Sequence, residues 1–388
     1  MDELSILVTI SVIIFTSPYF SKILRIPIPP IEIILGSLAG YYGYINDYYL
    51  FELVAEVGFF YLMFLAGAEV NLNVFRTTDK ALLKQGLVYL TLLYLLSFAI
   101  TAYLDLSHIF IVIMPLLSVG LIFALYKEYG KDKQWLNLSM LVGTMGELVS
   151  ISLLTFVGAM LEFGVGFELY KSIGYLILFL AAIVLAFRAL QVLFWWYPEL
   201  KIYLMPHYDK DEKDIRLSMA LFFMMIAIML FLHLEIAFGA FIAGMFIATF
   251  FEHKKELPHK LSAFGFGFLV PTFFIYIGST FDIEALWMEG LLETALWITV
   301  GMFSIRQISA LVFLKHLGLK QTVLLGLSHS MPLTLLIAIA TIAYKSHSID
   351  EHHYFAFILA SLIEVIIAMT GIKIICSQSL NVKLKPKN

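Results

Sequence analysis

The residue best placed to do chemistry is Glu147, the one charged residue in an apolar run from 136 to 161. Small and hydroxyl-bearing residues flank it, Thr144 among them, and the run is long enough to cross a bilayer. A charged side chain at that depth costs at least ~2.5–3.5 kcal/mol on insertion scales, so a carboxylate is rarely kept there without a use. We expect Glu147 to bind a proton or a cation, one at a time.

A buried carboxyl group of this kind can couple two fluxes. Burial away from water favours its protonated form, whereas a cation beside it favours the ionised form. The proton therefore leaves when the cation arrives and returns when the cation departs. The alternative is a structural Glu147 that a basic partner neutralises permanently.

The composition tells what must surround this group. The chain has 388 residues, of which 61% are hydrophobic and 14% charged, against roughly 25% charged in a soluble domain. This balance predicts an all-α, polytopic integral membrane protein. The single cysteine, Cys376, excludes an internal disulfide and a cysteine-rich metal site.

A helix of about 20 apolar residues crosses the hydrocarbon core, and this ruler predicts about 13 spans. Their expected ranges are 3–20, 28–46, 51–73, 83–103, 108–126, 135–161, 170–195, 215–233, 235–251, 262–281, 290–314, 320–343 and 353–376. We expect one transmembrane domain over 1–388, with a short basic cytoplasmic tail at 377–388.

The basic residues give the expected orientation. With the N-terminus outside, only Lys171 and Lys345 of the 25 Lys and Arg residues lie in outer connections. Arg188 and Arg306 lie within spans, and the others lie in inner connections or the tail. Because cytoplasmic connections are rich in Lys and Arg, this distribution predicts the C-terminus inside.

Two short sequence matches indicate an internal repeat. EIILG at 32–36 matches EIAFG at 235–239, and GAEVNL at 67–72 resembles GSTFDI at 278–283. Both pairs are seven spans apart, and an odd offset inverts the second copy in the bilayer, as in many secondary transporters. We predict repeats at about 1–161 and 215–376, with a linker helix at about 170–195.

The fifth and twelfth spans each carry a helix breaker beside hydroxyl residues. The fifth has Pro115 near Ser118, and the twelfth has Pro332 between Ser330 and Thr334. Interrupted helices at matching places indicate a midplane site, because their free carbonyls and helix ends interact with ions. The alternative is a simple kink within a packed helix. The predicted ligands of the proton or cation are Glu147, Thr144, Ser118, Ser330 and Thr334.

Three further residues within spans could serve this site. Arg306 keeps its charge in proteins, so it is a candidate counter-charge to Glu147 in the ion-free state, or a residue that locks helices together. Glu364, in the repeat counterpart of the sixth span, is a candidate second titrating site or a partner of a polar neighbour. His329 is a candidate pH sensor, although a lone His more often only bonds a neighbour.

Other kinds of chemistry lack their sequence signatures. The chain has no phosphate-binding loop, dinucleotide fingerprint or Ser-His-Asp arrangement, so we expect no enzyme and no cofactor. The spacing of His347, His352 and His353 does not predict a metal site. We expect no nucleic-acid partner. Transport would then run on ion gradients across the lipid bilayer.

Three longer motifs carry a resemblance to a known family. They are GFFYLMFLAGAE at 58–69, FGAFIAG at 238–244 and VPTFFIYIGS at 270–279. With them, nearly the whole chain resembles the membrane domain of the monovalent cation:proton antiporter-2 family, the Kef-type exchangers. The resemblance implies 13 helices in two inverted repeats, a homodimer, and exchange of Na⁺ or K⁺ for H⁺ in a bacterial inner membrane.

The chain departs from that family at its ion site. The family commonly has an amide residue followed by Asp in the sixth span, where this chain has Gly146 and Glu147. Hydroxyl residues of the fifth-span break are reduced to Ser118, and the usual twelfth-span signature is replaced by SMPLT at 330–334. Many relatives also carry a nucleotide-binding domain, which we do not expect in this chain.

The sequence therefore predicts a secondary-active antiporter that exchanges a monovalent cation for protons by alternating access. Two alternatives stay open. One is a gated, channel-like K⁺ efflux protein on the same scaffold, and the other is a membrane sensor that transports nothing.

Overall fold

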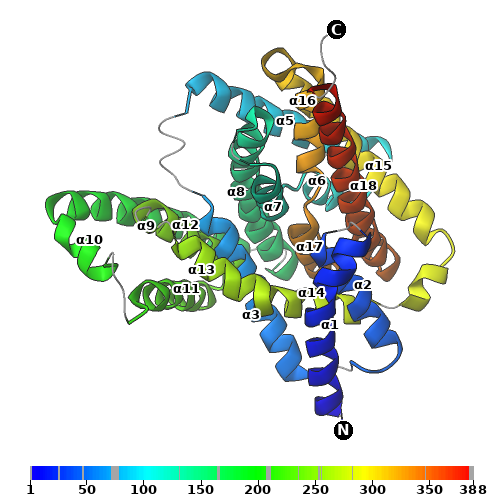
Figure 1. Cartoon of the computed structure of the whole chain (residues 1–388), viewed down its shortest axis with the longest axis horizontal. Helices are drawn as coiled ribbons and strands as arrows, with labels where there is room; N and C mark the ends of the chain where they lie inside the picture. The colour runs from blue at the N-terminus through cyan, green and yellow to red at the C-terminus, as the bar shows by residue number, and fades with distance from the viewer. Residues whose placement is uncertain are drawn as a thin grey trace. The chain divides into compact units, whose positions relative to one another are not determined.

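The computed structural model describes residues 2–24, 27–45, 48–70, 78–130, 132–163, 167–206, 211–234, 236–251, 254, 256–281, 283–345 and 347–383. Every regular element in these ranges is a helix (Figure 1). The first half comprises α1 (Asp2–Leu24), α2 (Ile28–Tyr41), α3 (Tyr49–Ala68), α5 (Lys80–Tyr103), α6 (Phe110–Ile113), α7 (Gly120–Tyr129), α8 (Gln134–Phe163) and α9 (Phe167–Trp196).

The second half continues with α10 (Pro198–Leu204), α11 (Lys213–Leu232), α12 (Ile236–Phe250), α13 (Leu257–Phe264), the π-helical η1 (Gly265–Leu269), α14 (Val270–Thr280), η2 (Ile283–Trp287), α15 (Leu291–Ala310), η3 (Leu311–Phe313), α16 (Leu314–His329), α17 (Leu333–Lys345) and α18 (Glu351–Lys383). Within the described ranges, eight stretches of helix are long and apolar enough to cross a membrane. The number of crossings and their orientation stay predictions.

Local sequence explains where the helices begin. Pro27 precedes α2, and prolines occupy its first turn, where the missing N–H costs no helical bond. Asp79 caps α5, because its carboxylate accepts a hydrogen bond from the amide of Ala81 at 3.0 Å. Asp350 caps α18 in the same way through the amide of His353.

Two predicted spans are interrupted. The fifth consists of α6 and α7, separated by a non-helical segment that contains Pro115. The twelfth consists of α16 and α17, separated at residues 330–332, where Pro332 precedes the new helix. A proline lacks the backbone N–H of a helical hydrogen bond, and its ring clashes with the preceding turn, so a helix tends to end near it. Met114, the residue before Pro115, still has helical dihedral angles, and the chain leaves the helix after it.

The chain forms two compact units. Unit 1 contains residues 1–14, 46–77 and 151–276, and unit 2 contains residues 15–45, 78–150 and 277–388. The chain passes between them within α1, α8 and α14. Each unit therefore combines segments from both halves of the sequence.

In unit 1, α3 and α12 cross at very short range. A Cβ atom on Gly244 would lie 1.9 Å from the carbonyl oxygen of Phe64, and one on Gly67 would lie 2.0 Å from that of Phe241. The α3 backbone thus lies against the α12 backbone where these glycines sit. Tyr61 links α3 to α13, because its hydroxyl donates to the carbonyl of Leu261 at 3.1 Å.

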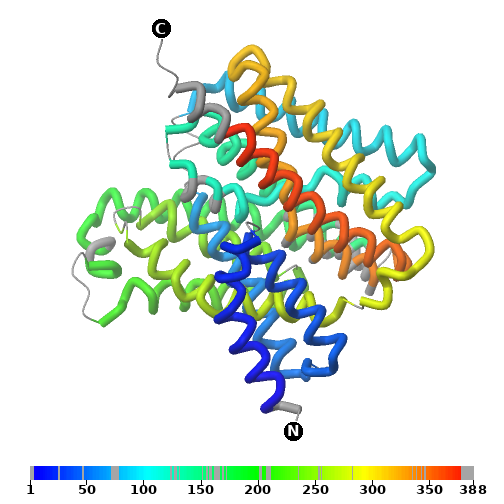
Figure 2. Tube along the Cα trace, turned by 45° about the vertical axis from the view of Figure 1, so that its right-hand side comes forward, coloured from blue at the N-terminus to red at the C-terminus, as the bar shows by residue number. Residues whose placement is uncertain are grey.

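In unit 2, α15 packs along α18 and α16 and also contacts α5. Figure 2 shows the red end of the chain, α18, running beside the yellow trace of α15. The two interrupted elements lie against each other, since α16 contacts α7 and α17 contacts α6. Unit 2 therefore brings both breaks into one bundle.

Candidate ion site

The non-helical segment between α6 and α7, residues 114–119, is the centre of the candidate site. Polar groups of other helices form hydrogen bonds with the main chain of three of its residues. Leu116 accepts through its carbonyl oxygen, the amide of Leu117 donates to Ser150 Oγ at 3.3 Å, and the amide of Val119 donates to Glu147. These hydrogen bonds fix the non-helical conformation of the segment, which is called the α6–α7 break below.

Glu147 lies in the middle of α8 and is fully buried, with 0% of its surface exposed. Its Oε2 accepts the Val119 amide at 3.2 Å, and its Oε1 is 3.5 Å from the Ser118 hydroxyl, which donates to it. These donors sit where α7 begins, and the positive end of a helix favours a negative charge. Among the described residues, Glu147 forms no ion pair, so a permanent basic partner is not observed.

The other predicted ligands behave differently from one another. Ser118 contacts Glu147, whereas the hydroxyl of Thr144 donates to the carbonyl of Met140 in its own helix at 2.7 Å. Ser330 is buried at the end of α16 and donates to the carbonyl of Gly326 at 3.0 Å. Thr334 lies in the first turn of α17, but its side chain falls outside the described residues.

Arg306, in α15, is fully buried and pairs with Glu364 of α18 rather than with Glu147. Its Nη1 lies 2.6 Å from Glu364 Oε1, and its Nη2 donates to the carbonyl of Leu116 at 2.9 Å. Because α18 packs along α15, Glu364 reaches Arg306 directly, while Glu147 is engaged by the start of α7. The expected direct pairing with Glu147 is therefore not formed in this structure.

His329 is the last residue of α16 and is bonded at both ring nitrogens. Nε2 lies 3.2 Å from the carbonyl oxygen of Ser139, and Nδ1 lies 2.8 Å from the hydroxyl of Tyr89. A carbonyl only accepts, so Nε2 carries a proton and Nδ1 accepts from Tyr89 in the neutral ring. These bonds join α16 to α8 and α5. A sensing role for His329 stays a prediction.

Gly146 explains why α8 can approach the break so closely. A Cβ atom at this position would lie 2.2 Å from Leu117 Cδ1 and 3.0 Å from Leu117 Cβ. The side chain of Leu117 thus fills the space in which a residue with a side chain would sit. The α6–α7 break thus packs against a glycine at position 146, and an amide side chain before Glu147 would collide with Leu117.

Several contributors escaped the sequence reasoning. Ser150 and Tyr89 have no sequence feature beyond their position in apolar runs that would assign them to the site. The main-chain groups of the break cannot be assigned from residue types at all. Glu32, in the predicted span 28–46, was not a candidate for the site, but it is 2% exposed and accepts from Ser17 Oγ at 3.2 Å. Only its depth, counted from the helix start, could have indicated this.

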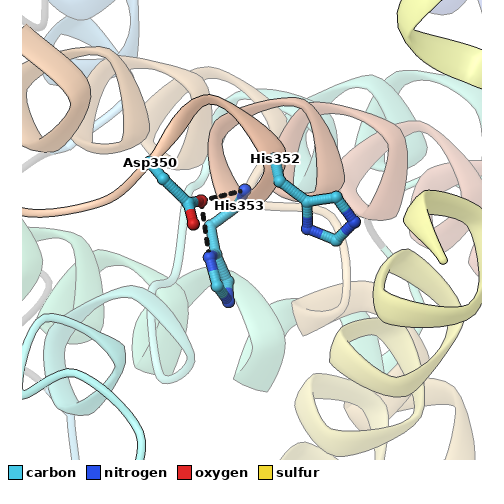
Figure 3. A group of neighbouring side chains, drawn as sticks. All are labelled: Asp350, His352 and His353. Carbon is cyan, nitrogen blue, oxygen red and sulfur yellow. Dashed lines mark hydrogen bonds and ion pairs between the residues drawn. The ribbon is translucent and has the colours of Figure 1, made fainter. Parts of the chain in front are cut away.

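A cluster of Asp350, His352 and His353 lies at the start of α18, with candidate ligand atoms within 4.8 Å of one another (Figure 3). Asp350 Oδ1 accepts from the amide of His353 at 2.8 Å and lies 2.7 Å from its ring Nδ1. In Figure 3 the His352 ring turns away from this pair. Burial works to raise the pKa of Asp350, but the hydrogen bonds and charges of His353 and His352 outweigh it and lower that pKa. The arrangement is that of a helix cap.

Helices of membrane-spanning length define a multi-pass integral membrane protein, and a carboxyl group is buried in it beside an interrupted helix. The chain belongs to the family described as "Sodium/hydrogen exchanger, transmembrane", whose profile matches residues 10–378. The family is thus shown at this level, while the narrower Kef-type branch is not.

Two curated relatives are antiporters by name. The chain is 24% identical over 383 residues to "Putative Na(+)/H(+) antiporter YjbQ" of Bacillus subtilis, covering 92% of this chain and 60% of that protein. It is 28% identical over 318 residues to "Probable Na(+)/H(+) antiporter 3" of Methanocaldococcus jannaschii, covering 79% of each. The chain therefore spans less than two thirds of the first relative.

A solved structure shares the fold. The sodium proton antiporter MjNhaP1 from Methanocaldococcus jannaschii, determined at pH 8, superposes with a TM-score of 0.67 at 12% sequence identity. The match covers 96% of this chain and 99% of that one. At this identity the likeness concerns the fold alone.

Proposed function

We propose that the chain is a secondary-active antiporter that exchanges a monovalent cation for protons. The observation that carries the proposal is the buried carboxyl group of Glu147, which is bonded to the α6–α7 break and has no ion-pair partner among the described residues. Membership of the sodium/hydrogen exchanger family and the names of both relatives support it.

In the proposed cycle, Glu147 holds either a proton or a cation. A protonated carboxyl group is neutral and can stay buried at little cost, whereas an ionised one needs a positive partner. The arriving cation supplies that charge, and Glu147 with the Ser118 hydroxyl offers it oxygen ligands. Competition for one carboxyl group then couples the two fluxes.

The remaining predicted residues support this site in different ways. Ser330 and Thr334 lie at the α16–α17 break, residues 330–332, which would complete the ion path because α16 contacts α7 and α17 contacts α6. Thr144 lies one turn before Glu147 and would need to leave its own helix carbonyl to bind an ion. Arg306 is proposed as a fixed counter-charge near the break, acting through Leu116.

The finer assignments rest on sequence. The relatives are named for sodium, so we propose Na⁺ as the first cation to test, with K⁺ as the second. We propose the Kef-type branch on the basis of three sequence motifs. The inverted repeats, the outside N-terminus and a homodimer in the cell membrane are likewise proposed from the sequence.

The test is exchange in liposomes that contain a pH-sensitive dye, with Na⁺, K⁺ or Li⁺ added outside. We expect Glu147→Gln to lower cation-driven proton movement at least about 100-fold, because the neutral amide cannot exchange a proton for a cation. Glu147→Asp keeps the charge and should retain measurable exchange with a changed KM.

A matched control removes a different buried carboxyl group. Glu32 accepts from Ser17, and among the described residues no hydrogen bond or ion pair joins it to the α6–α7 break, so Glu32→Gln should leave exchange within about twofold of the wild type. Undiminished cation-driven dye responses in Glu147→Gln would contradict the proposal. A correctly folded wild-type protein that gives no dye response would contradict it as well.

A further inference from the structure

The guanidinium group of Arg306 bridges two partners that lie far apart in sequence. One nitrogen binds Glu364 of α18 at 2.6 Å, and another donates to the carbonyl of Leu116 in the α6–α7 break at 2.9 Å. All of Arg306 and Glu364 is buried. A planar guanidinium can serve two acceptors in fixed directions, which the point charge of a lysine cannot.

Side chains of two other helices, α15 and α8, hold the main chain of the break. Arg306 fixes the carbonyl of Leu116, Ser150 fixes the amide of Leu117, and Glu147 accepts from Val119. The carbonyl held by Arg306 and the amide held by Ser150 belong to one planar peptide unit, so one cannot turn without the other. Any rotation of Leu116 therefore displaces the groups that face Glu147.

Glu364 determines whether Arg306 can hold that carbonyl. Arginine stays charged in proteins, and a buried cation without an anion is strongly disfavoured. Arg306 Nε and Glu364 Oε2 have no hydrogen-bond partner among the described residues, so the pair has few other bonds that fix it. Among the described residues, the carboxyl group of Glu364 is the acidic group that pairs with the guanidinium.

We propose that Glu364 is a positioning residue for the ion site, which orients Arg306 so that the α6–α7 break presents Ser118 and Val119 to Glu147. It contacts no transported ion and keeps its charge throughout the cycle. This role rests on the proposed function for its transport readout, but its structural readout does not. The rival interpretation makes Glu364 a second carboxyl group that carries protons.

The structural readout is hydrogen–deuterium exchange of the break in the full chain. The amides of Leu117 and Val119 are bonded to Ser150 and Glu147, so they report the order of this segment. We expect Glu364→Gln and Arg306→Lys each to speed exchange over residues 114–120 about tenfold or more, because the Leu116 carbonyl loses its fixed donor. Unchanged exchange in both variants would overturn the proposal, whether or not the chain transports ions.

The transport readout separates the two roles of Glu364. A positioning role predicts that Glu364→Gln raises the KM for the cation by about 2- to 30-fold, the range found for residues that act through others. The proton:cation ratio and the number of titrations in the pH profile should not change. A changed ratio, or the loss of one titration, would support the rival and refute a fixed charge.

Two further variants keep the test decisive. Ser361 lies one turn before Glu364 on α18, is buried, and donates to the carbonyl of Ile358 in its own helix. Ser361→Ala should therefore change neither the exchange of the break nor KM. If Glu364→Gln fails to fold, the double variant Arg306→Leu, Glu364→Leu removes both charges together and should still loosen the break.

Discussion

At the scale of single residues, the contact between Gly146 and Leu117 determines how near Glu147 comes to the α6–α7 break. The space beside Gly146 is filled by Leu117, whose Cδ1 atom would lie 2.2 Å from an added Cβ. An amide residue before the acidic one, as in the family that the sequence resembles, cannot be accommodated unless Leu117 moves. The two positions thus form one packing unit.

We predict that Gly146→Asn lowers stability by about 1–3 kcal/mol, the usual cost of overpacking, and lowers exchange activity because Glu147 is displaced. Adding Leu117→Ala should recover much of both, since it removes the atoms that clash. Thermal unfolding in detergent and the liposome assay measure the two effects. Gly174→Ala is the control, because a Cβ there would meet nothing within 4 Å. An unaffected Gly146→Asn protein would show that Leu117 yields freely.

The sequence could predict that Glu147 is buried, because its depth can be counted along the apolar run and a charged group at that depth has a known energetic cost. It could not predict the partners of Arg306 or His329. Glu364 lies 58 residues from Arg306, and Ser139 lies 190 from His329, so only the packed bundle selects them. Side-chain identity indicated that these residues interact with something, and tertiary contacts decided with what.

At the scale of helices, the glycines of the resemblance motifs have a physical role in packing. Gly67 lies near the end of the first motif and Gly244 ends the second, and both allow the backbones of α3 and α12 to touch. A Cβ on Gly278, the counterpart of Gly67 in the proposed repeat, would likewise lie 2.1 Å from the carbonyl oxygen of Ile33 in α2. Glycine contacts at both matching places support the proposed repeat.

We predict that Gly244→Ala lowers stability by at least about 1–3 kcal/mol, because its Cβ would meet main-chain atoms of α3 that cannot rotate away. A fluorescence-detected thermal stability assay measures the loss. Gly267→Ala lies in η1, where a Cβ meets nothing within 4 Å, and should change the transition little. Equal behaviour of the two variants would contradict close packing of α3 on α12.

The cap of α18 gives a second prediction at this scale. Asp350→Ala should lower the free energy of unfolding by about 1 kcal/mol through loss of the N-cap, whereas Asp350→Asn should retain most of the capping contribution. The folded-state pKa of Asp350 is lowered, so its contribution is present above the unfolded pKa of about 3.9 and is lost as the pH falls through the folded value. Hydrogen exchange of residues 351–355 between pH 3 and 7 measures both effects. A loss of protection near neutral pH would contradict this assignment.

At the scale of the whole molecule, span lengths were within reach of the sequence, whereas the division into units was not. The helix predicted at 83–103 is α5 at Lys80–Tyr103, because a bilayer sets the length of an apolar run. Unit 2, however, assembles residues 15–45, 78–150 and 277–388 through contacts between distant segments. Hydropathy carries no information about which helices pack together, so it predicts elements better than their partners.

Stoichiometry is a property of the whole cycle, and the charges of unit 2 predict it. Glu364 pairs with Arg306, so in the proposed mechanism Glu147 is the carboxyl group that exchanges a proton for a cation at the break. One group that carries either ion gives one-for-one exchange, which moves no net charge. In liposomes with opposed Na⁺ and proton gradients, the dye signal should show no net proton movement when the inside-to-outside concentration ratios of Na⁺ and H⁺ are equal. This null point should stay the same when a membrane potential is imposed. The same measurement with Ser361→Ala controls for loss of a buried polar group on α18. A null point that shifts with the imposed potential would mean that a second charge crosses with each turnover, and Glu364 would then be the first group to test as its carrier.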